Sequence, residues 1–198
     1  MKWEEYASRV LAICRIGQKY SKDPYALENY QELEELSLKM MEGRTEPELV
    51  RNLYVRDVYP TPSSTVRVLV FNPQGRLLMV KEDDGGWAVP GGWCEVFYSL
   101  QKNAVKEVFE ETGIHCEIQA LIGVFQREKY KDYPTLVSEY VHYFWATTTD
   151  ETLHHNHEVS EAGFFDLKEL PPLSRKNTEA ELRQALAYIK TGQQVPFD

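Results

Sequence analysis

The sequence has few cysteines, no long apolar run and no leader-like start. Its three cysteines, Cys14, Cys94 and Cys116, are odd in number and far apart. We therefore expect reduced thiols in packing positions, and neither a disulfide framework nor a zinc site. No apolar run is long enough to cross a membrane. The acidic start "MKWEEYASRV" lacks the positive and then apolar stretch of a signal peptide, so we expect a cytoplasmic protein.

Basic residues are also scarce relative to acidic ones. The chain has 22 Lys and Arg against 31 Asp and Glu, a net charge of −9. This balance argues against nucleic acid as a partner, because such an interface needs a basic face. Phosphate-bearing substrates remain open if a cation mediates the contact. With 42% hydrophobic and 12% aromatic residues, the 198-residue chain has the composition of a globular protein.

The first part of the chain has only helical patterns. We expect a small all-helical N-terminal domain over residues 1–58, with helices within 1–20, 22–43 and 45–54. Asp23 is a natural N-cap for the second helix, and Pro24 suits its first position. Prolines and small polar residues then predict a linker over residues 59–64.

Residues 65–198 alternate between strand and helix patterns. Strands are expected within 65–71, 76–82, 117–128, 138–148 and 163–167. Helices are expected over 99–111 and 178–192, the second with a capping box formed by Thr178 and Glu181. Strands flanking helices predict an α/β fold in which helices cover a mixed sheet.

Three glutamates, Glu107, Glu110 and Glu111, crowd into five residues just before Gly113. At about 100° per residue, they fall on one side of a helix. Carboxylates this close raise each other's pKa and lower stability. A divalent cation removes the conflict, since Mg²⁺ and Mn²⁺ prefer carboxylate and water oxygens and often bridge to substrate phosphates.

A solvated acidic helix face is the alternative interpretation, and it is common for a glutamate-rich helix. Two features favour the cation site instead. The stretch "VPGGW", which contains Gly91 and Gly92, precedes the helix and lets the backbone approach a ligand closely. Gly113 ends the helix directly after the acidic cluster.

The stretch from Gly92 to Ile114 resembles the Nudix box, in which a glycine is followed at fixed spacing by Glu, then by Arg-Glu-aliphatic-x-Glu-Glu-x-Gly-aliphatic. Gly92 fills the first position. The last part is filled in register by Glu107, Val108, Glu110, Glu111, Gly113 and Ile114. Two positions depart from the motif. Its first glutamate falls on Tyr98, and its arginine falls on Lys106, which keeps the charge but loses the planar fork.

The resemblance covers roughly residues 65–171 and implies a Nudix α/β/α sandwich. It also implies Mg²⁺- or Mn²⁺-dependent hydrolysis of a nucleoside diphosphate linked to another group X. The metal ligands would be Glu107, Glu110 and Glu111, with Glu95 in the preceding loop as a further candidate. Lys106 would replace the arginine that orients these glutamates.

Further site residues follow from the same resemblance. Nudix enzymes often take another carboxylate from the loop before the last strand, which favours Glu161 and, after it, Glu158. The histidines beside them, at 154, 155 and 157, match no standard zinc spacing. The substrate-binding candidates are Gly91, Gly92, Arg67, Arg127 and Tyr130. Arg67 could equally be structural, and Tyr130, like Tyr133, could simply belong to a hairpin.

Helices followed by a Nudix domain resemble a subfamily of bacterial hydrolases acting on ADP-ribose or CDP-choline. The "PGGW" stretch and the Lys-Glu pair favour CDP-choline as the small-molecule nucleotide substrate. ADP-ribose is the second candidate, and clearance of oxidised nucleotides is the third. A non-catalytic nucleotide-sensing domain is the alternative from another class. The resemblance further implies a homodimer assembled through the helical domain.

Overall fold

The structure is a computed structural model that describes residues 3–42, 62–131, 139–154 and 159–191. The chain divides into two compact units, Met1–Pro60 and Thr61–Asp198. Several sequence predictions lie outside the described residues. These are the helix within 45–54, the last residues of two other predicted helices, Gly43 and Gly192, residues 59–61 of the linker, Tyr133, His155, His157 and Glu158.

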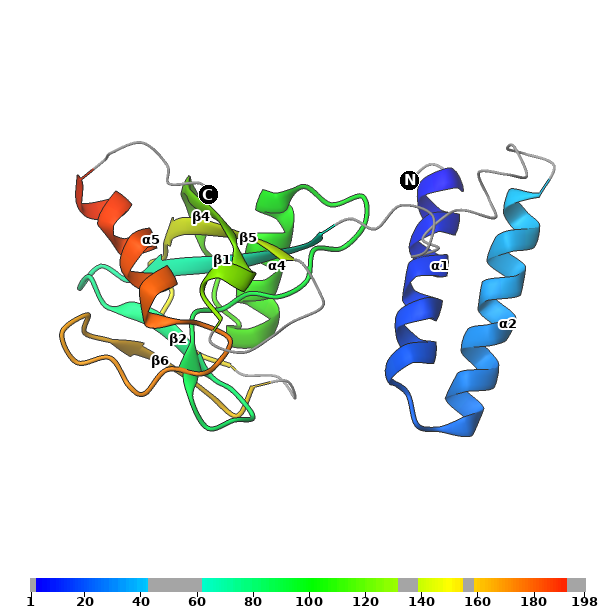
Figure 1. Ribbon diagram of the computed structural model, residues 1–198, viewed down its shortest axis with the longest axis horizontal. Helices are drawn as coiled ribbons and strands as arrows, with labels where there is room; N and C mark the ends of the chain where they lie inside the picture. Colours follow the sequence, from blue (N-terminus) through cyan, green and yellow to red (C-terminus); the bar gives the residue numbers. More distant parts are fainter. Residues whose placement is uncertain (1–2, 43–61, 132–138, 155–158, 192–198) are drawn as a thin grey trace. The chain divides into compact units, whose positions relative to one another are not determined.

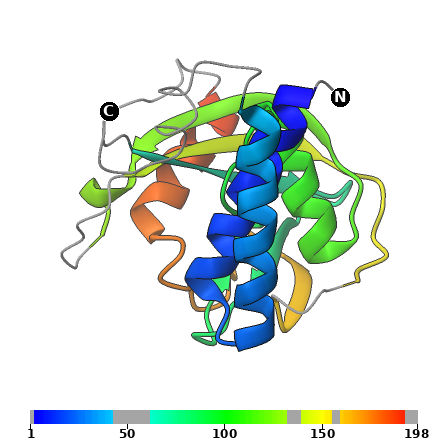
Figure 2. The same cartoon turned by 90° about the vertical axis from the view of Figure 1, so that its right-hand side faces the viewer.

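The first unit is a helical hairpin of α1 (Trp3–Tyr20) and α2 (Pro24–Met41). The two helices lie side by side along their length (Figures 1 and 2). A small buried cluster of Ala7, Leu11 and Met41 joins them. As predicted, Asp23 caps α2, because its side chain accepts a hydrogen bond from the Tyr25 amide.

The second unit is built on a mixed six-stranded sheet. Its strands are β1 (Ser63–Phe71), β2 (Leu77–Lys81), β3 (Trp87–Ala88), β4 (Glu117–Gln126), β5 (Glu139–Thr147) and β6 (Glu161–Phe165). The strand order is β3-β2-β1-β5-β4, and β6 pairs with β2. β1 and β5 run parallel, while the other pairs are antiparallel. The predicted mixed sheet is confirmed.

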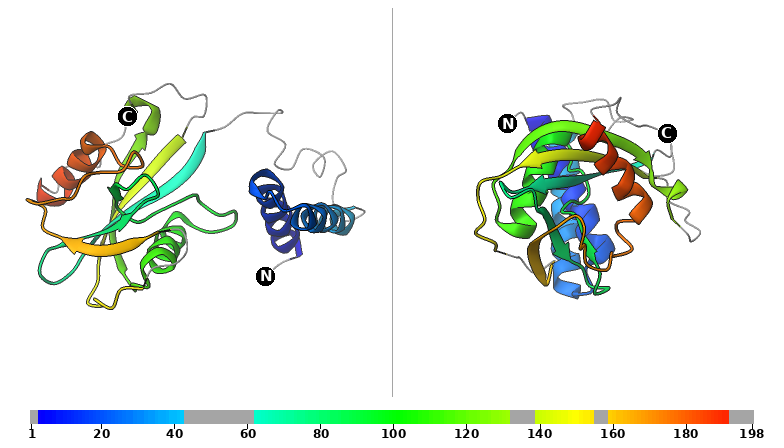
Figure 3. Two further views of the ribbon diagram at one scale, coloured as in Figure 1. Left: turned by 90° about the horizontal axis from the view of Figure 1, so that it is seen from below. Right: turned by 90° about the vertical axis from the view of Figure 1, so that its left-hand side faces the viewer.

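Helices cover both faces of this sheet. α4 (Leu100–Thr112) and α5 (Glu179–Thr191) lie on opposite sides of it (Figure 3). Alternation along β1 explains this, because successive side chains point to opposite faces. Val68 packs in the cluster on the α4 face, whereas Leu69 packs in the cluster on the α5 face. The α/β/α sandwich is therefore confirmed.

Local signals fix the ends of the two helices. The Ser99 hydroxyl accepts the Lys102 amide at the start of α4, and Gly113 ends the helix with φ 73°. The capping box of α5 is present, since the Thr178 amide donates to Glu181 at 3.0 Å. The sequence missed β3 and the 3₁₀ turn η1 (Arg127–Lys129), which are too short to leave a period.

The three cysteines are free, as predicted. Cys14 is buried in the first unit, while Cys94 and Cys116 pack against the α4-face cluster. None of the helices in the described ranges has the length and apolar character that a bilayer crossing requires.

Candidate active site

The glycine-rich loop before α4 lies directly against two of the predicted glutamates. The Gly91 amide donates to Oε2 of Glu111 at 3.0 Å. A Cβ atom at Gly92 would collide with the Glu107 carboxylate, so only glycine allows this approach. Both carboxylates are largely buried, at 9% exposure for Glu107 and 5% for Glu111. The structure therefore brings the loop and these two glutamates together.

Glu111 has an environment that opposes its negative charge. Burial raises the pKa of its carboxyl from 4.5 to about 7. The Arg67 guanidinium and the Gly91 amide lower this pKa, whereas the negative charges of Glu107 and Glu82 raise it further. Burial is the largest of these effects, so the environment favours the neutral form of Glu111 when no cation is bound.

Arg67 forms hydrogen bonds to the backbone of the glycine-rich loop. It is 4% exposed, and its Nη1 donates to the Gly91 carbonyl at 2.5 Å and to the Val89 carbonyl at 3.5 Å. Its charge also acts on Glu111. Arg67 thus connects the backbone of the loop with the carboxylate that the same loop binds.

Lys106 joins the other two metal-ligand candidates on the outer side of α4. Its ammonium lies 3.1 Å from Glu95 and forms an ion pair with Glu110. Burial lowers the pKa of Lys106, but hydrogen bonds to Glu110 and Glu95 outweigh it, so that the pKa is raised overall. Lys106 therefore holds Glu95 and Glu110 together on the more exposed side of the helix.

Glu161 is the first residue of β6, and its side chain is 58% exposed. Its carboxylate lies 3.4 Å from the Lys81 ammonium on the neighbouring strand. Lys81 and Glu161 are paired residues in the β2–β6 ladder, and Glu82 follows directly after β2. Glu161 is thus placed at the edge of the sheet, in a solvated ion pair.

Arg127 and Tyr130 follow β4 and lie in well-connected positions. Arg127 forms a largely buried ion pair with Glu139 at 2.9 Å and donates to the Lys176 carbonyl at 2.7 Å. The Tyr130 hydroxyl donates to Gln184 at 2.9 Å. The two side chains thus link the end of β4 to β5, to the 173–178 segment and to α5.

Sequence reasoning missed residues that reach the site from other segments. The Asn177 side chain accepts the Val89 amide and donates to the Tyr143 hydroxyl, both at 2.7 Å. Glu82 is 4% exposed and pairs with Lys176 at 2.5 Å. The sequence did contain a signal for Glu82, because this glutamate directly follows a buried apolar strand. Nothing local indicated Lys176 or Asn177.

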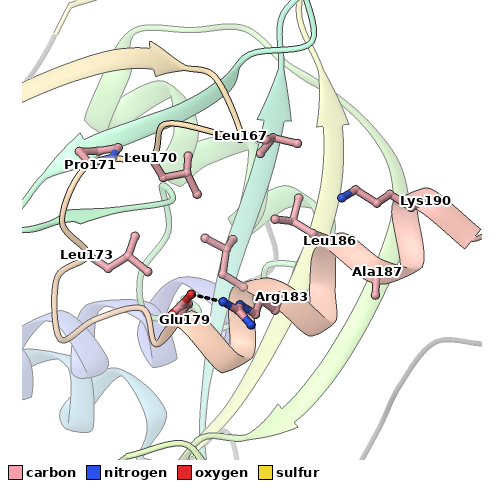
Figure 4. Close-up of a pocket in the computed structure, with 10 residues that line it drawn as sticks. Leu167, Leu170, Pro171, Leu173, Glu179, Arg183, Leu186, Ala187 and Lys190 are labelled. Atoms are coloured by element: carbon pink, nitrogen blue, oxygen red, sulfur yellow. Dashed lines mark hydrogen bonds and ion pairs between the residues drawn. The ribbon is translucent and has the colours of Figure 1, made fainter.

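Two cavities lie on the α5 side of the sheet. The larger, of about 650 Å³, is enclosed by α5 and the segment after β6, and an ion pair between Glu179 and Arg183 lies at its wall (Figure 4). The smaller, of about 320 Å³, is lined by Tyr130, Lys131, Leu173, Ser174, Arg175, Asn177 and Thr178. Of the predicted site residues, Tyr130 lines the smaller cavity, and none lines the larger one.

The donor chemistry of the site suits a hard divalent cation. Glu107 and Glu111 offer carboxylate oxygens, which Mg²⁺ and Mn²⁺ prefer. Within the described ranges, no three His, Cys, Asp or Glu side chains are gathered closely enough to hold an ion by themselves. Substrate phosphates and water would complete such a coordination sphere, as is usual for Mg²⁺. A bound cation would also stabilise the ionised form of Glu111, which burial disfavours.

The family follows from comparison with known proteins. The model of the NUDIX domain matches residues 61–188, which span the sheet, the glycine loop and the acidic helix. The chain belongs to the Nudix family. It is a Nudix hydrolase, and Nudix hydrolases generally use divalent cations.

A second family model matches the first unit of this Nudix hydrolase. It is described as a UDP-X-like, N-terminal oligomerisation domain and covers residues 1–53. The two matches together span most of the chain, and the resemblance found in the sequence is confirmed.

Relatives of this Nudix hydrolase carry the names of pyrophosphatases. "Putative ADP-ribose pyrophosphatase YjhB" of Bacillus subtilis is 35% identical over 193 residues, covering 96% of this chain and 93% of the relative. A crystal structure of a UDP-X diphosphatase is 26% identical, with a TM-score of 0.67 and full coverage of both chains. A Streptococcus suis ADP-ribose pyrophosphatase structure is 33% identical over 70% of this chain and all of that chain, with a TM-score of 0.61.

Proposed function

We propose that this Nudix hydrolase is a divalent-cation-dependent pyrophosphohydrolase. It cleaves a nucleoside diphosphate linked to a group X into a nucleoside monophosphate and phospho-X. The observation that carries the proposal is the contact of Glu107 and Glu111 with the glycines of the loop. These carboxylates could hold a cation beside backbone atoms that approach a phosphate.

The reaction adds water across the pyrophosphate. The oxygen of water forms a bond to one phosphorus, the P–O–P bridge breaks, and the bridging oxygen leaves with the other phosphate. A carboxylate of the site accepts the proton from the attacking water. The bound cation would neutralise phosphate charge and make the water more acidic.

The residues of the chain position these groups. The Gly91 amide fixes one oxygen of Glu111, and Arg67 fixes the loop that carries this amide. Glu107, Glu110, Glu111 and Glu95 are the proposed cation ligands. The glycines, Arg67, Arg127 and Tyr130 are the proposed substrate contacts, and Lys106 and Glu161 complete the proposed catalytic set.

Two substrates are proposed, in an order that experiment can decide. CDP-choline is favoured by the sequence pattern of the loop and of the Lys-Glu pair. ADP-ribose is favoured by the names of two relatives, a "Putative ADP-ribose pyrophosphatase" and an ADP-ribose pyrophosphatase. Both are nucleoside diphosphates linked to X, so the proposed reaction is the same for either substrate.

The deciding experiment is a panel of nucleoside diphosphate derivatives assayed with Mg²⁺ and with Mn²⁺, with both products identified. We expect cleavage of CDP-choline or ADP-ribose at the pyrophosphate, and loss of turnover when a chelator is in excess. Full turnover in excess chelator would contradict the cation dependence. A chain that binds these nucleotides without cleaving them would instead be a nucleotide-sensing domain.

We further propose that the protein works as a cytoplasmic homodimer. The match of residues 1–53 to an oligomerisation domain supports the assembly. A two-fold symmetric dimer is the commonest form of such assemblies. Measurement of the mass of the full chain in solution tests it.

A further inference from the structure

Glu82 is a buried carboxylate that the predicted cation set does not include. It is 4% exposed, and its Oε1 has no hydrogen-bond partner in the part of the chain that the structure describes. A buried carboxylate oxygen without a partner is costly. Such an oxygen is a ready acceptor for a cation or a polar ligand.

The strand β2 directs Glu82 to the face of the sheet that α4 covers. Leu78 packs in the same cluster as Ala104 and Val108 of α4. The hairpin pairing continues past the strand, since the Glu82 amide donates to the Gly86 carbonyl at 2.9 Å. Because side chains alternate along a strand, Glu82 shares the face of Leu78 and therefore of the acidic helix.

The charge of Glu82 acts electrostatically on Glu111, a residue of the predicted cation site. Its negative charge raises the pKa of Glu111, as does that of Glu107. Glu82 and Glu107 are thus each within electrostatic reach of Glu111, although the three carboxylates do not form a preassembled metal site in the described ranges. A cation between them would relieve the repulsion.

Lys176, which lies 94 positions after Glu82 in the sequence, supplies a positive charge beside the Glu82 carboxylate. Lys176 lies 2.5 Å from Oε2 of Glu82, and its own side chain is half exposed. The turn after Glu82 also holds the segment of Lys176, because Asp84 accepts the Arg175 amide and the Ser174 hydroxyl, both at 3.0 Å. Lys176 therefore occupies one oxygen of Glu82 and leaves Oε1 without a hydrogen-bond partner.

We propose that Glu82 is a further ligand of the divalent cation bound by Glu107 and Glu111, with Lys176 as its counter-ion when the cation is absent. This inference rests on the proposed function, because it concerns the cation of that reaction. It makes the end of β2 part of the site, together with the loop and α4.

The test is Mn²⁺ binding to the full chain, measured as free Mn²⁺ by electron paramagnetic resonance. Glu82→Gln keeps the shape of the side chain and an acceptor for Lys176 but removes the charge. We expect it to weaken Mn²⁺ binding by about 10-fold or more. Glu117→Gln, an exposed carboxylate at the start of β4, is the control and should bind as the wild type does.

Binding of Mn²⁺ by a folded Glu82→Gln variant within twofold of the wild type would overturn the proposal. If this variant does not fold, Lys176→Met decides. Tighter Mn²⁺ binding by Lys176→Met supports the proposal, since the competing ammonium is gone, and unchanged or weaker binding overturns it. A wild-type chain that cleaves no nucleotide but depends on Glu82 for Mn²⁺ would refute the proposed function alone.

Discussion

Glu111 combines burial, an amide donor and two negative neighbours in one side chain. We expect Glu111→Gln to keep the fold, because the amide oxygen of glutamine can still accept the Gly91 amide. A neutral amide is a poor cation ligand, so kcat should fall by about 100-fold or more. Steady-state kinetics on the preferred substrate, with thermal unfolding as the check on folding, measure this. Near-normal turnover by the folded variant would refute the role of Glu111.

The raised pKa of Glu111 also predicts a pH dependence of stability without metal. Below pH 4.5 the carboxyl is neutral in both states, and as pH rises the unfolded chain ionises first. Stability is therefore lost between pH 4.5 and about 7. At about 1.4 kcal/mol per pKa unit, the loss is about 3 kcal/mol.

Glu111→Gln removes this loss, which allows a direct comparison. In chelator, the free energy of unfolding of the wild type should fall relative to that of the variant over this pH range. Urea titrations at pH 4.5 and at pH 7.5 measure the difference. If the free energy of unfolding changed equally in the two proteins between these pH values, the burial of Glu111 would not oppose its charge.

Single residues also show what the sequence could and could not reveal about the site. Glu107 and Glu111 stand next to each other on one helix, so their spacing alone indicated that they cooperate. Lys176 is 94 positions from Glu82, and only the folded sheet brings the two together. The contact of Arg67 with the loop is equally non-local, and for this reason the sequence left its role open.

Among the elements, the loop from Gly91 to Ser99 and α4 act as one unit. Both ends of α4 were predictable, because Ser99 and Gly113 carry local capping chemistry. The sequence pattern predicts that β1 starts at residue 65. The strand begins at Ser63, because parallel pairing with β5 extends to Ser63 opposite Glu139. Pairing partners are set by tertiary structure, which local patterns do not encode.

The close approach of the loop to α4 predicts a specific effect of Gly92→Ala. The added Cβ would collide with the Glu107 carboxylate, which can move because it ends a flexible side chain. We expect a large fall in kcat with a small change in melting temperature. Kinetics and thermal unfolding of the same preparation measure both.

Gly75→Ala is the matched comparison for this change. Gly75 has φ 73° and open space around it, so alanine there is strained but meets no other residue. This variant should lose about 1 kcal/mol of stability and keep its kcat. If Gly92→Ala instead behaved like Gly75→Ala, the contact with Glu107 would have no part in the reaction.

At the scale of the whole molecule, the two units differ in the chemistry they carry. Every proposed cation ligand lies in the second unit. The first unit carries most of the large apolar side chains that are exposed in the described residues. Those of the first unit are Tyr6, Ile13, Ile16, Tyr20, Tyr25, Leu33 and Leu36. Apolar surface of this kind usually marks an interface. The sequence predicted the helices from their periods, but which of their faces would remain exposed depends on how they pack.

Deletion of residues 1–55 should therefore change assembly or substrate choice more than the chemistry. The mass in solution and the ratio of CDP-choline to ADP-ribose cleavage, compared with the full chain, measure this. Ile16→Glu, on an exposed apolar position of α1, should weaken assembly without deletion, while Gln31→Glu on α2 is the control. An unchanged mass and substrate ratio in the truncated chain would show that the helices are a passive extension.

The hydrogen bond from the Gly91 amide to Glu111 has a spectroscopic consequence. An amide proton shared with a carboxylate is deshielded, because charge-assisted hydrogen bonds are short and strong. The proton resonance of Gly91 should therefore lie downfield in the NMR spectrum of the metal-free protein. Diamagnetic Mg²⁺ should shift this line as it draws electron density from Glu111, whereas paramagnetic Mn²⁺ should broaden it. The backbone of the protein thus contains a natural probe for ion binding that needs no added label or substrate.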